Sequence, residues 1–267
     1  AKGRRGYRMG NGVLEDLLLR DGLICTENNY HMGVTAENVS SRFGVTREDQ
    51  DKLALRSQQY AYKAQQEGKF DSQIVPVTVH KRKGDVVIDT DEGPREGSNM
   101  ETLAKLKPAF KKGGTVTAGN ASGINDAAAF FVLADAAKAA AAGQKPIARM
   151  VSYAVAGVPN DIMGEGPIPA TKLALKKAGL TLDQMDVIES NEAFAAQALS
   201  VSKVLGLDPA KTNPNGGAIA LGHPVGCSGA FIATKAIYEM NRIGGKYCLV
   251  TMCIGGGQGI AVIFERV

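Results

Sequence analysis

The chain has 267 residues, of which 44% are hydrophobic, so it can bury a sizeable core and hold more than one domain. Its 31 basic and 27 acidic residues give a formal net charge of +4, too small to indicate a nucleic-acid partner. No segment is long and apolar enough to span a bilayer, which argues against a membrane protein. The four cysteines lack close pairing, which suits a reducing compartment, and Cys248 and Cys253 lack the spacing of metal ligands. We therefore expect no metal site.

The first part of the chain, residues 1–119, is polar and largely irregular, with a few regular pieces. A short helix is predicted over 35–41, with Thr35 as its N-cap. A longer helix is predicted over 46–68, where the letters TRED resemble a capping box. Strands over 74–80 and 85–89 would flank the pair Lys83-Gly84 as a hairpin. Basic clusters at 81–83 and around Pro108 are typical of a solvated face, and they would also suit a ligand that carries phosphates.

From Val116 onward, strand and helix patterns alternate. The expected elements are strand 116–118, a helix from about 125, strand 130–134, helix 135–142, strand 148–155, helix 168–178, strand 186–190, helix 193–205, helix 226–241 and strands 246–253 and 260–266. Such alternation predicts an α/β protein with a mixed sheet that is covered by helices on both faces.

The most informative stretch is 216–229, which reads GGAIALGHPVGCSG and places His223 between glycine-rich turns. Glycine allows close approach of backbone or ligand, and Pro224 stiffens the exit from the turn. An imidazole held on such a loop can act as a general base or as a donor to an oxyanion. A buried structural histidine would produce a similar pattern, so this stretch alone leaves both interpretations open.

Two further elements end predicted strands. Cys253 follows an apolar run and precedes three glycines, a setting that can lower the pKa of a thiol or supply N–H donors to an oxyanion. A small core residue at a strand end would look the same. Asn191 begins the sequence NEAFA between a strand and a helix, where its side chain would either cap the helix or reach into a cleft.

In this order, the NEAF, GHP and CxGGG motifs resemble the thiolases, the acetyl-CoA acetyltransferase family. The letters HMG with TAEN at 31–38 and NASGIND at 120–126 also match the family's pattern, so the resemblance covers essentially the whole chain. It implies the layered α-β-α-β-α thiolase fold. The domains implied are a loop (lid) domain over 1–119, the end of the N-terminal core domain over 120–147 and the C-terminal core domain over 148–267. An incomplete first core half should leave apolar surface exposed, which predicts association or insolubility.

The resemblance also implies roles for individual residues. His223 would be the general base, Cys253 the second acid/base, and Asn191 the holder of a water in an oxyanion hole, with the N–H of Gly255 in the other hole. The residues expected to contact the substrate or coenzyme A are His31, Ser122, Arg95, Met163, Ala193 and Phe194. The reaction implied is condensation of two acetyl-CoA into acetoacetyl-CoA, or the reverse thiolysis, with no cofactor beyond the CoA thioesters themselves.

The chain departs from the family pattern at one point. The family's nucleophilic cysteine lies in an Asn-x-x-Cys-x-Ser-Gly segment, and none of Cys25, Cys227, Cys248 and Cys253 has that context. The sequence therefore resembles the C-terminal two-thirds of a thiolase, whose nucleophile would come from a missing N-terminal segment or a separate chain. The complete enzyme is expected to be a homodimer or homotetramer. We expect a cytoplasmic location and leave a mitochondrial one open, because the region that would carry a targeting signal is absent.

Three other interpretations deserve comparison. The related ketoacyl synthases share the fold but lack a C-terminal Cys-x-Gly-Gly, so Cys253 argues against them. A catalytically inactive, CoA-binding fragment or a structural subunit is a second alternative, because the chain lacks the nucleophile and would not turn over alone. A nucleotide loop over 255–259 has neither the Lys-Ser/Thr of a P-loop nor the spacing of a dinucleotide fingerprint.

Overall fold

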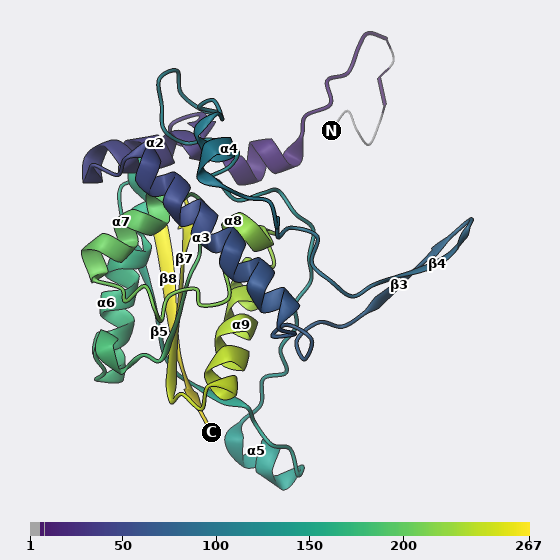
Figure 1. Ribbon diagram of the computed structural model, residues 1–267, viewed down its shortest axis with the longest axis vertical. Coiled ribbons are helices and arrows are strands. Elements are labelled where there is room, and N and C mark those ends of the chain that lie inside the picture. Colours follow the sequence, from purple (N-terminus) through teal and green to yellow (C-terminus); the bar gives the residue numbers. More distant parts are fainter. Residues whose placement is uncertain (1–5, 8) are drawn as a thin grey trace.

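A four-stranded mixed sheet forms the centre of the molecule (Figure 1). The computed structural model describes residues 6, 7 and 9–267, so residues 1–5 and 8 of the predicted loop domain lie outside the described residues. The strands are β5 (Ala148–Gly157), β6 (Val187–Ser190), β7 (Tyr247–Gly255) and β8 (Gln258–Arg266), in the order β5-β8-β7-β6. The pair β6–β7 is parallel and the other two pairs are antiparallel, as the sequence predicted for a mixed sheet.

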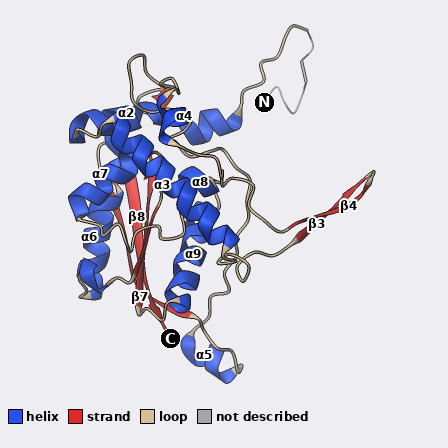
Figure 2. Ribbon diagram, in the orientation of Figure 1, coloured by secondary structure: helices blue, strands red, loops and turns tan. Residues whose placement is uncertain are grey.

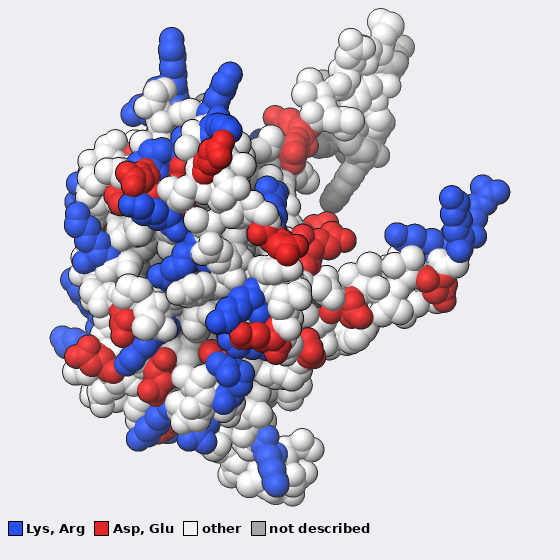
Figure 3. All heavy atoms as spheres, in the orientation of Figure 1, with Lys and Arg blue, Asp and Glu red and all other residues white. Residues whose placement is uncertain are grey.

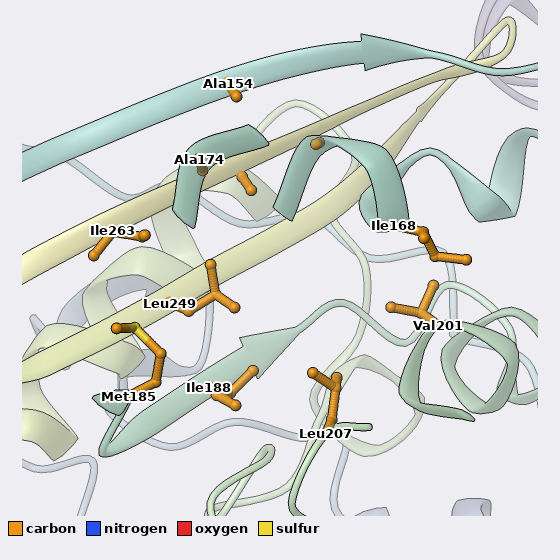
Figure 4. Packing of buried hydrophobic residues seen from close by; sticks show 11 residues of the cluster. Ala154, Ile168, Ala174, Met185, Ile188, Val201, Leu207, Leu249 and Ile263 are labelled. Atoms are coloured by element: carbon orange, nitrogen blue, oxygen red, sulfur yellow. The ribbon is translucent and has the colours of Figure 1, made fainter. Parts of the chain in front are cut away.

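Helices cover both faces of this sheet. Neighbouring residues of a strand point to opposite sides, and here both sides are apolar, so each face is buried by helices. Val187 and Cys248 belong to one apolar cluster with side chains of α9, whereas the next residues, Ile188 and Leu249, belong to a second cluster with side chains of α6 and α7. Figure 4 shows this second cluster, in which Ile168 of α6 and Val201 of α7 join buried residues of the strands. The helices concerned are α6 (Pro167–Ala178), α7 (Ala195–Leu205) and α9 (Ser228–Arg242).

The remaining elements lie outside this sheet, with α2 and α4 near one end of it and α5 near the other (Figure 1). They are the π-helical turn η1 (Leu18–Leu23), strands β1 (Ile24–Cys25) and β2 (Tyr30–His31), helices α2 (Met32–Phe43), α3 (Arg47–Gln66), α4 (Met100–Ala104), α5 (Ala136–Ala141) and α8 (Ala218–Leu221), strands β3 (Val77–Lys81) and β4 (Gly84–Ile88), and the 3₁₀ turns η2 (Asn160–Glu165) and η3 (Leu182–Gln184). Thr46 caps α3 in a reciprocal capping box with Asp49, as its sequence indicated.

Two local expectations for the first helix need correction. The helix α2 begins at Met32, and its N-cap is His31 rather than Thr35. Thr35 lies inside the helix and its hydroxyl donates to the carbonyl of Met32 at 2.6 Å. An imidazole nitrogen can accept from a free N–H at a helix start in the same way as the side-chain oxygen of a common N-cap residue.

The predicted helix from about 125 and the predicted strand 130–134 are wrong. The chain has no regular structure from 122 to 135. Phe130, Val132 and Leu133 are 89%, 98% and 80% exposed, so the side chains that gave the strand signal are not packed. A strand needs a hydrogen-bonding neighbour, and the described residues provide none along this segment. The apolar surface that the sequence led us to expect is therefore exposed here, whereas the expected association of the chain stays a prediction.

The β3–β4 hairpin projects away from the sheet (Figure 2). All residues of both strands are exposed, and basic side chains gather at the tip, where Lys81, Arg82 and Lys83 follow one another (Figure 3). The hairpin was predicted, although its first strand begins at Val77 rather than at residue 74. The three proposed domains and the boundaries between them stay predictions. Among the described residues, no helix has the length and apolar character needed to cross a membrane.

Candidate active site

Backbone hydrogen bonds bring three of the motifs together. The segment 120–123 runs beside 193–195, because Ala195 N–H donates to the carbonyl of Asn120 and Ser122 N–H donates to that of Ala193, at 2.8 and 3.0 Å. The N–H of His223 reaches the carbonyl of Gly123 at 3.4 Å. Segments that are about 70 and 100 residues apart in sequence therefore meet at the end of the sheet where β6 and β7 terminate.

His223 lies between a side chain from β6's end and one from the start of α9. Its Nε2 is 3.4 Å from Nδ2 of Asn191, and its Nδ1 is 2.6 Å from Oγ of Ser228. Burial lowers the pKa of His223 below 6.5, because a charged imidazolium would lose its hydration. The ring is therefore neutral at pH 7, which is the form a general base requires.

Asn191 does not cap α7. The N-cap of that helix is Phe194, and no side chain bonds there. Asn191 is 3% exposed, and its backbone N–H donates to the carbonyl of Thr251 on β7 at 3.0 Å. Of the two roles that its position suggested, capping of the helix is therefore wrong, and a side chain that reaches into a cleft stays a prediction.

Cys253 lies near the end of β7 and is 5% exposed. It belongs to an apolar cluster whose other members are Met32, Ala36, Phe110, Val116, Ala121, Met163, Ala193, Phe194 and Ala196. Burial raises the pKa of the Cys253 thiol to about 11. Of the two possibilities that its glycine-rich setting left open, burial therefore argues against a lowered pKa, and the supply of N–H donors stays a prediction. At pH 7 the thiol keeps its proton and can donate it.

Gly255 ends β7, and Gly256-Gly257 turns the chain into β8. All three have positive φ angles, of 90°, 58° and 83°. A two-residue loop with positive φ at both positions is the turn that matches the twist of a hairpin, which explains the glycines. A Cβ on Gly257 would lie 2.2 Å from the carbonyl oxygen of Val158, so this turn tolerates no side chain there. On Gly255, the nearest neighbour of such a Cβ is Met32, at 3.4 Å.

His31 is half-buried beside the apolar cluster of Cys253. Its ring stacks on Phe110 with the centroids 4.6 Å apart and the planes at 20°. Phe110 in turn meets Phe194 edge to face at 5.9 Å. A Cβ on Gly33 would stand 2.3 Å from the Phe110 ring, so glycine is required for this approach. The backbone N–H of Gly33 donates to Nδ1 of His31 at 2.9 Å, and burial lowers the pKa of the imidazole.

The other predicted contact residues fall into two groups. Met163, Ala193 and Phe194 are 3%, 4% and 8% exposed and share the cluster of Cys253, so the structure brings them together with it. Ser122 is adjacent, because its hydroxyl donates to the carbonyl of Ala193 at 2.9 Å. Arg95 stands apart from them: its side chain is exposed, and its backbone N–H donates to Gln58 on α3 at 2.8 Å.

Sequence reasoning missed two residues that touch the predicted histidines. Phe110 lies in a loop with no motif around it, so only the fold reveals its stacking on His31. Ser228 is five residues after His223 at the first position of a helix, and this spacing was a usable signal. Among the described residues, no cluster of His, Cys, Asp or Glu is arranged to hold a metal ion.

The carboxylate of Glu192 holds the loop that carries His223 against α3. It is 1% exposed and accepts from Ser57 Oγ on α3 at 2.7 Å, from Asn213 Nδ2 at 3.0 Å and from the N–H of Ile219 at 3.3 Å. Gly217 closes the arrangement, since a Cβ there would lie 2.1 Å from the Glu192 carboxyl carbon. The second residue of the NEAF motif thus has a structural role that the sequence did not reveal.

Comparisons with known proteins identify the family of the chain. A family model described as the thiolase N-terminal domain matches residues 1–137, and one described as the thiolase C-terminal domain matches residues 144–266. The chain is 56% identical over 265 residues to the beta-ketothiolase BktB of Cupriavidus necator, covering 99% of this chain and 67% of that protein. It is 55% identical over 266 residues to an acetyl-CoA acetyltransferase of Escherichia coli, covering 100% of this chain and 68% of that protein.

Solved structures show the same relationship. The acetyl-CoA acetyltransferase of Bacillus anthracis superposes with a TM-score of 0.95 at 46% identity, covering 99% of this chain and 67% of that one. Human mitochondrial 3-ketoacyl-CoA thiolase superposes with a TM-score of 0.89 at 43% identity, covering 98% of this chain and 68% of that one. With both family models matched and the fold shared along nearly its whole length, the chain belongs to the thiolase family.

Proposed function

We propose that this chain supplies the base, the second acid/base and the acyl-binding surface of a thiolase-type acyltransferase. The reaction is the condensation of two acetyl-CoA into acetoacetyl-CoA or the reverse thiolysis. The observation that carries this proposal is that a neutral, half-buried His223 lies beside Asn191 after β6, while a buried thiol, Cys253, lies near the end of the neighbouring strand β7. Relatives named acetyl-CoA acetyltransferase support the choice of substrate.

In the first half-reaction, a cysteine thiol attacks the carbonyl of acetyl-CoA. His223 takes the proton of that thiol, the new carbon–sulfur bond forms, and the thiolate of CoA leaves. Cys253, whose pKa is raised to about 11, is a neutral thiol and can return a proton to the leaving thiolate. The products are an acetyl-enzyme, free CoA, a Cys253 thiolate and a protonated His223.

In the second half-reaction, the Cys253 thiolate removes a proton from the methyl group of the second acetyl-CoA. The high pKa of its thiol makes this thiolate a strong base. The carbanion attacks the carbonyl carbon of the acetyl-enzyme, a carbon–carbon bond forms, and the carbon–sulfur bond to the nucleophilic cysteine breaks as acetoacetyl-CoA is released. Protonated His223 returns its proton to the departing cysteine thiolate, and Cys253 is again a thiol. The enolate oxygen needs donors as it forms, and we assign this task to His223 and to a water held by Asn191. The N–H of Gly255 would serve the other oxyanion.

The nucleophile itself comes from outside this chain in our proposal. None of its four cysteines lies in the family's nucleophile motif, and Cys248 is buried in the sheet, with its pKa raised to about 12 by burial. A further thiolase segment, in the same protein or in a separate chain, would provide the cysteine, and the complete enzyme would be a homodimer or homotetramer. No cofactor beyond the CoA thioesters is needed by the steps above.

His31, Met163, Ala193 and Phe194 would line the acyl site, since an apolar cluster with one imidazole suits a short acyl chain. Ser122 would contact the pantetheine chain of CoA. Arg95 is proposed to bind the phosphate groups of CoA. Its side chain is exposed and lies away from the buried cluster, which suits contact with a part of CoA that is far from the acyl group.

Intact-mass spectrometry of the denatured sample after incubation with acetyl-CoA tests the proposal. A second polypeptide that carries one acetyl group would show a working thiolase in which this chain provides the acid and the base. If only the unmodified 267-residue chain appears, the chain alone is inactive and the alternative applies, namely a CoA-binding fragment or structural subunit. A CoA-binding measurement on the isolated chain then separates these two.

A further inference from the structure

The hydroxyl group of Ser228 has two polar neighbours, and their chemistry differs. Its Oγ is 2.6 Å from Nδ1 of His223 and 2.9 Å from the carbonyl oxygen of Pro224. A carbonyl oxygen can only accept a hydrogen bond, whereas an imidazole nitrogen can donate or accept. Ser228 is 1% exposed, so water does not substitute for either neighbour. The position of the hydroxyl proton of Ser228 therefore decides which nitrogen of the neutral His223 ring carries hydrogen.

The hydroxyl proton belongs between Ser228 and Pro224. If it pointed at His223 instead, two oxygen atoms would face each other at 2.9 Å with no hydrogen between them. With the proton on the carbonyl side, a lone pair of Oγ faces Nδ1, and the short contact of 2.6 Å requires Nδ1 to carry a hydrogen. The result is a chain of two bonds in the same direction, from imidazole to hydroxyl to carbonyl.

We propose that Ser228 is a positioning residue that holds neutral His223 in the Nδ1–H tautomer and so leaves Nε2 without a hydrogen, as the nitrogen that can accept the proton of the reacting thiol. The amide of Asn191 supports this assignment, because its Nδ2 lies 3.4 Å from Nε2 and can only donate. The proposal deepens the proposed function, since it rests on His223 being the base. A free neutral histidine side chain favours the opposite, Nε2–H form, in which Nε2 cannot accept a proton.

His31 serves as an internal reference, because its surroundings call for the other tautomer, with hydrogen on Nε2. The backbone N–H of Gly33 donates to its Nδ1 at 2.9 Å, and a backbone amide cannot accept. A neutral His31 must therefore carry its hydrogen on Nε2. One chain thus contains two half-buried histidines whose surroundings call for different tautomers. The third histidine, His80, is exposed and faces Asp85 on the hairpin.

Long-range ¹H–¹⁵N spectra of the imidazole groups at about pH 8 test the proposal, because the nitrogen that carries hydrogen differs clearly in shift from the one that does not. Single substitutions of each histidine by glutamine assign the three signals. We expect His223 to show hydrogen on Nδ1 and His31 to show hydrogen on Nε2. A His223 signal with hydrogen on Nε2 in the unaltered chain would overturn the proposal whatever the catalytic outcome.

Ser228→Ala tests whether the hydroxyl is the cause. Its loss should move His223 toward the Nε2–H form and change the ratio of the two tautomers on the order of tenfold. Ser200→Ala is the matched control, because Ser200 is also fully buried in a helix with its hydroxyl on a backbone carbonyl, at 2.8 Å from that of Gln197. The control should leave the His223 signal unchanged. An unchanged tautomer in Ser228→Ala would contradict the assignment.

Ser228→Thr provides a second test in case the alanine variant does not fold. It retains a hydroxyl at the same position and should retain the Nδ1–H form, whereas a change to the Nε2–H form in a folded Ser228→Thr protein would count against the proposal. The spectra report on the tautomer alone. A confirmed tautomer in a chain that never supports acetyl transfer would therefore leave this inference standing and remove only the proposed function.

Discussion

Burial shifts the pKa values of the two titratable groups of the candidate site in opposite directions and favours the uncharged form of each. It lowers the pKa of His223, the proposed base, which keeps the imidazole neutral, and it raises the pKa of Cys253, the proposed acid, to about 11, which keeps the thiol protonated. A glycine-rich neighbourhood is thus compatible with either direction of shift. The enclosure of each side chain decides the direction, and this follows from its neighbours in space.

Cys253→Ala should abolish condensation in the complete enzyme while leaving formation of the acyl-enzyme largely intact. The reason is that the alanine variant lacks the base for the methyl group of the second substrate but keeps His223 for the first attack, and a CoA thiolate can leave without first receiving the proton of Cys253. Acyl-enzyme by mass spectrometry and acetoacetyl-CoA by absorbance measure the two steps separately. Equal loss of both steps would contradict the role assigned to Cys253.

The rate of acyl-enzyme formation should fall at acidic pH, with its midpoint below 6.5, the ordinary pKa of histidine. His223 must be neutral to accept a proton, and its lowered pKa keeps it neutral to a lower pH than an exposed histidine. Stopped-flow acylation between about pH 5 and about pH 8 measures this profile, and the His223 signal followed by NMR should titrate at the same midpoint. A midpoint above 6.5 would show that an unrecognised anion, rather than burial, controls the ring.

Between elements, a buried ion pair joins α9 to β6. Lys235 Nζ lies 2.9 Å from Oε2 of Glu189 and 2.6 Å from the carbonyl of Gly216, and the two charged side chains are 3% and 2% exposed. Burial raises the pKa of Glu189 to about 7, even though the ammonium group opposes the shift. The lysine also holds the segment that leads toward His223 through the bond to Gly216.

Lys235→Met should destabilise the chain by about 3 kcal/mol, because a buried carboxyl loses its counter-ion. The loss should be greater at higher pH. The folded-state pKa of Glu189 lies above its unfolded value of 4.5, so the stability linked to its protonation is present below pH 4.5 and is lost as the pH rises through about 7. Denaturant unfolding at several pH values measures both effects. The double variant Glu189→Leu with Lys235→Met is the control and should recover most of the stability.

Over the whole molecule, apolar side chains are unevenly exposed. Phe130 and Val132 are 89% and 98% exposed in a segment without regular structure, whereas the clusters on both faces of the sheet are almost fully buried. Large exposed apolar patches mark sites of association. The segment adjoins the candidate site, because it follows Gly123, whose carbonyl meets the N–H of His223.

The isolated chain should therefore self-associate, and Phe130→Asp combined with Val132→Asp should reduce this association. The two side chains are almost fully exposed in the folded chain, so the substitutions should not change its free energy of unfolding by more than about 0.5 kcal/mol. Sedimentation velocity over a range of concentrations measures the effect. Val75→Asp, at a residue that is 81% exposed elsewhere, is the control and should leave the association unchanged.

The sequence by itself determined the α/β class, most helices and strands after residue 135, and the family, because local periodicity and fixed motif letters do not depend on distant neighbours. It failed over 125–134, where an apolar run looks like a strand but has no pairing partner in the described chain. It also could not foresee the partners of the site residues. The stacking of Phe110 on His31, the contact of Ser228 with His223 and the raised pKa of Cys253 all depend on which side chains the fold encloses together. Such enclosure is a property of three-dimensional packing, and only the tertiary structure decided it.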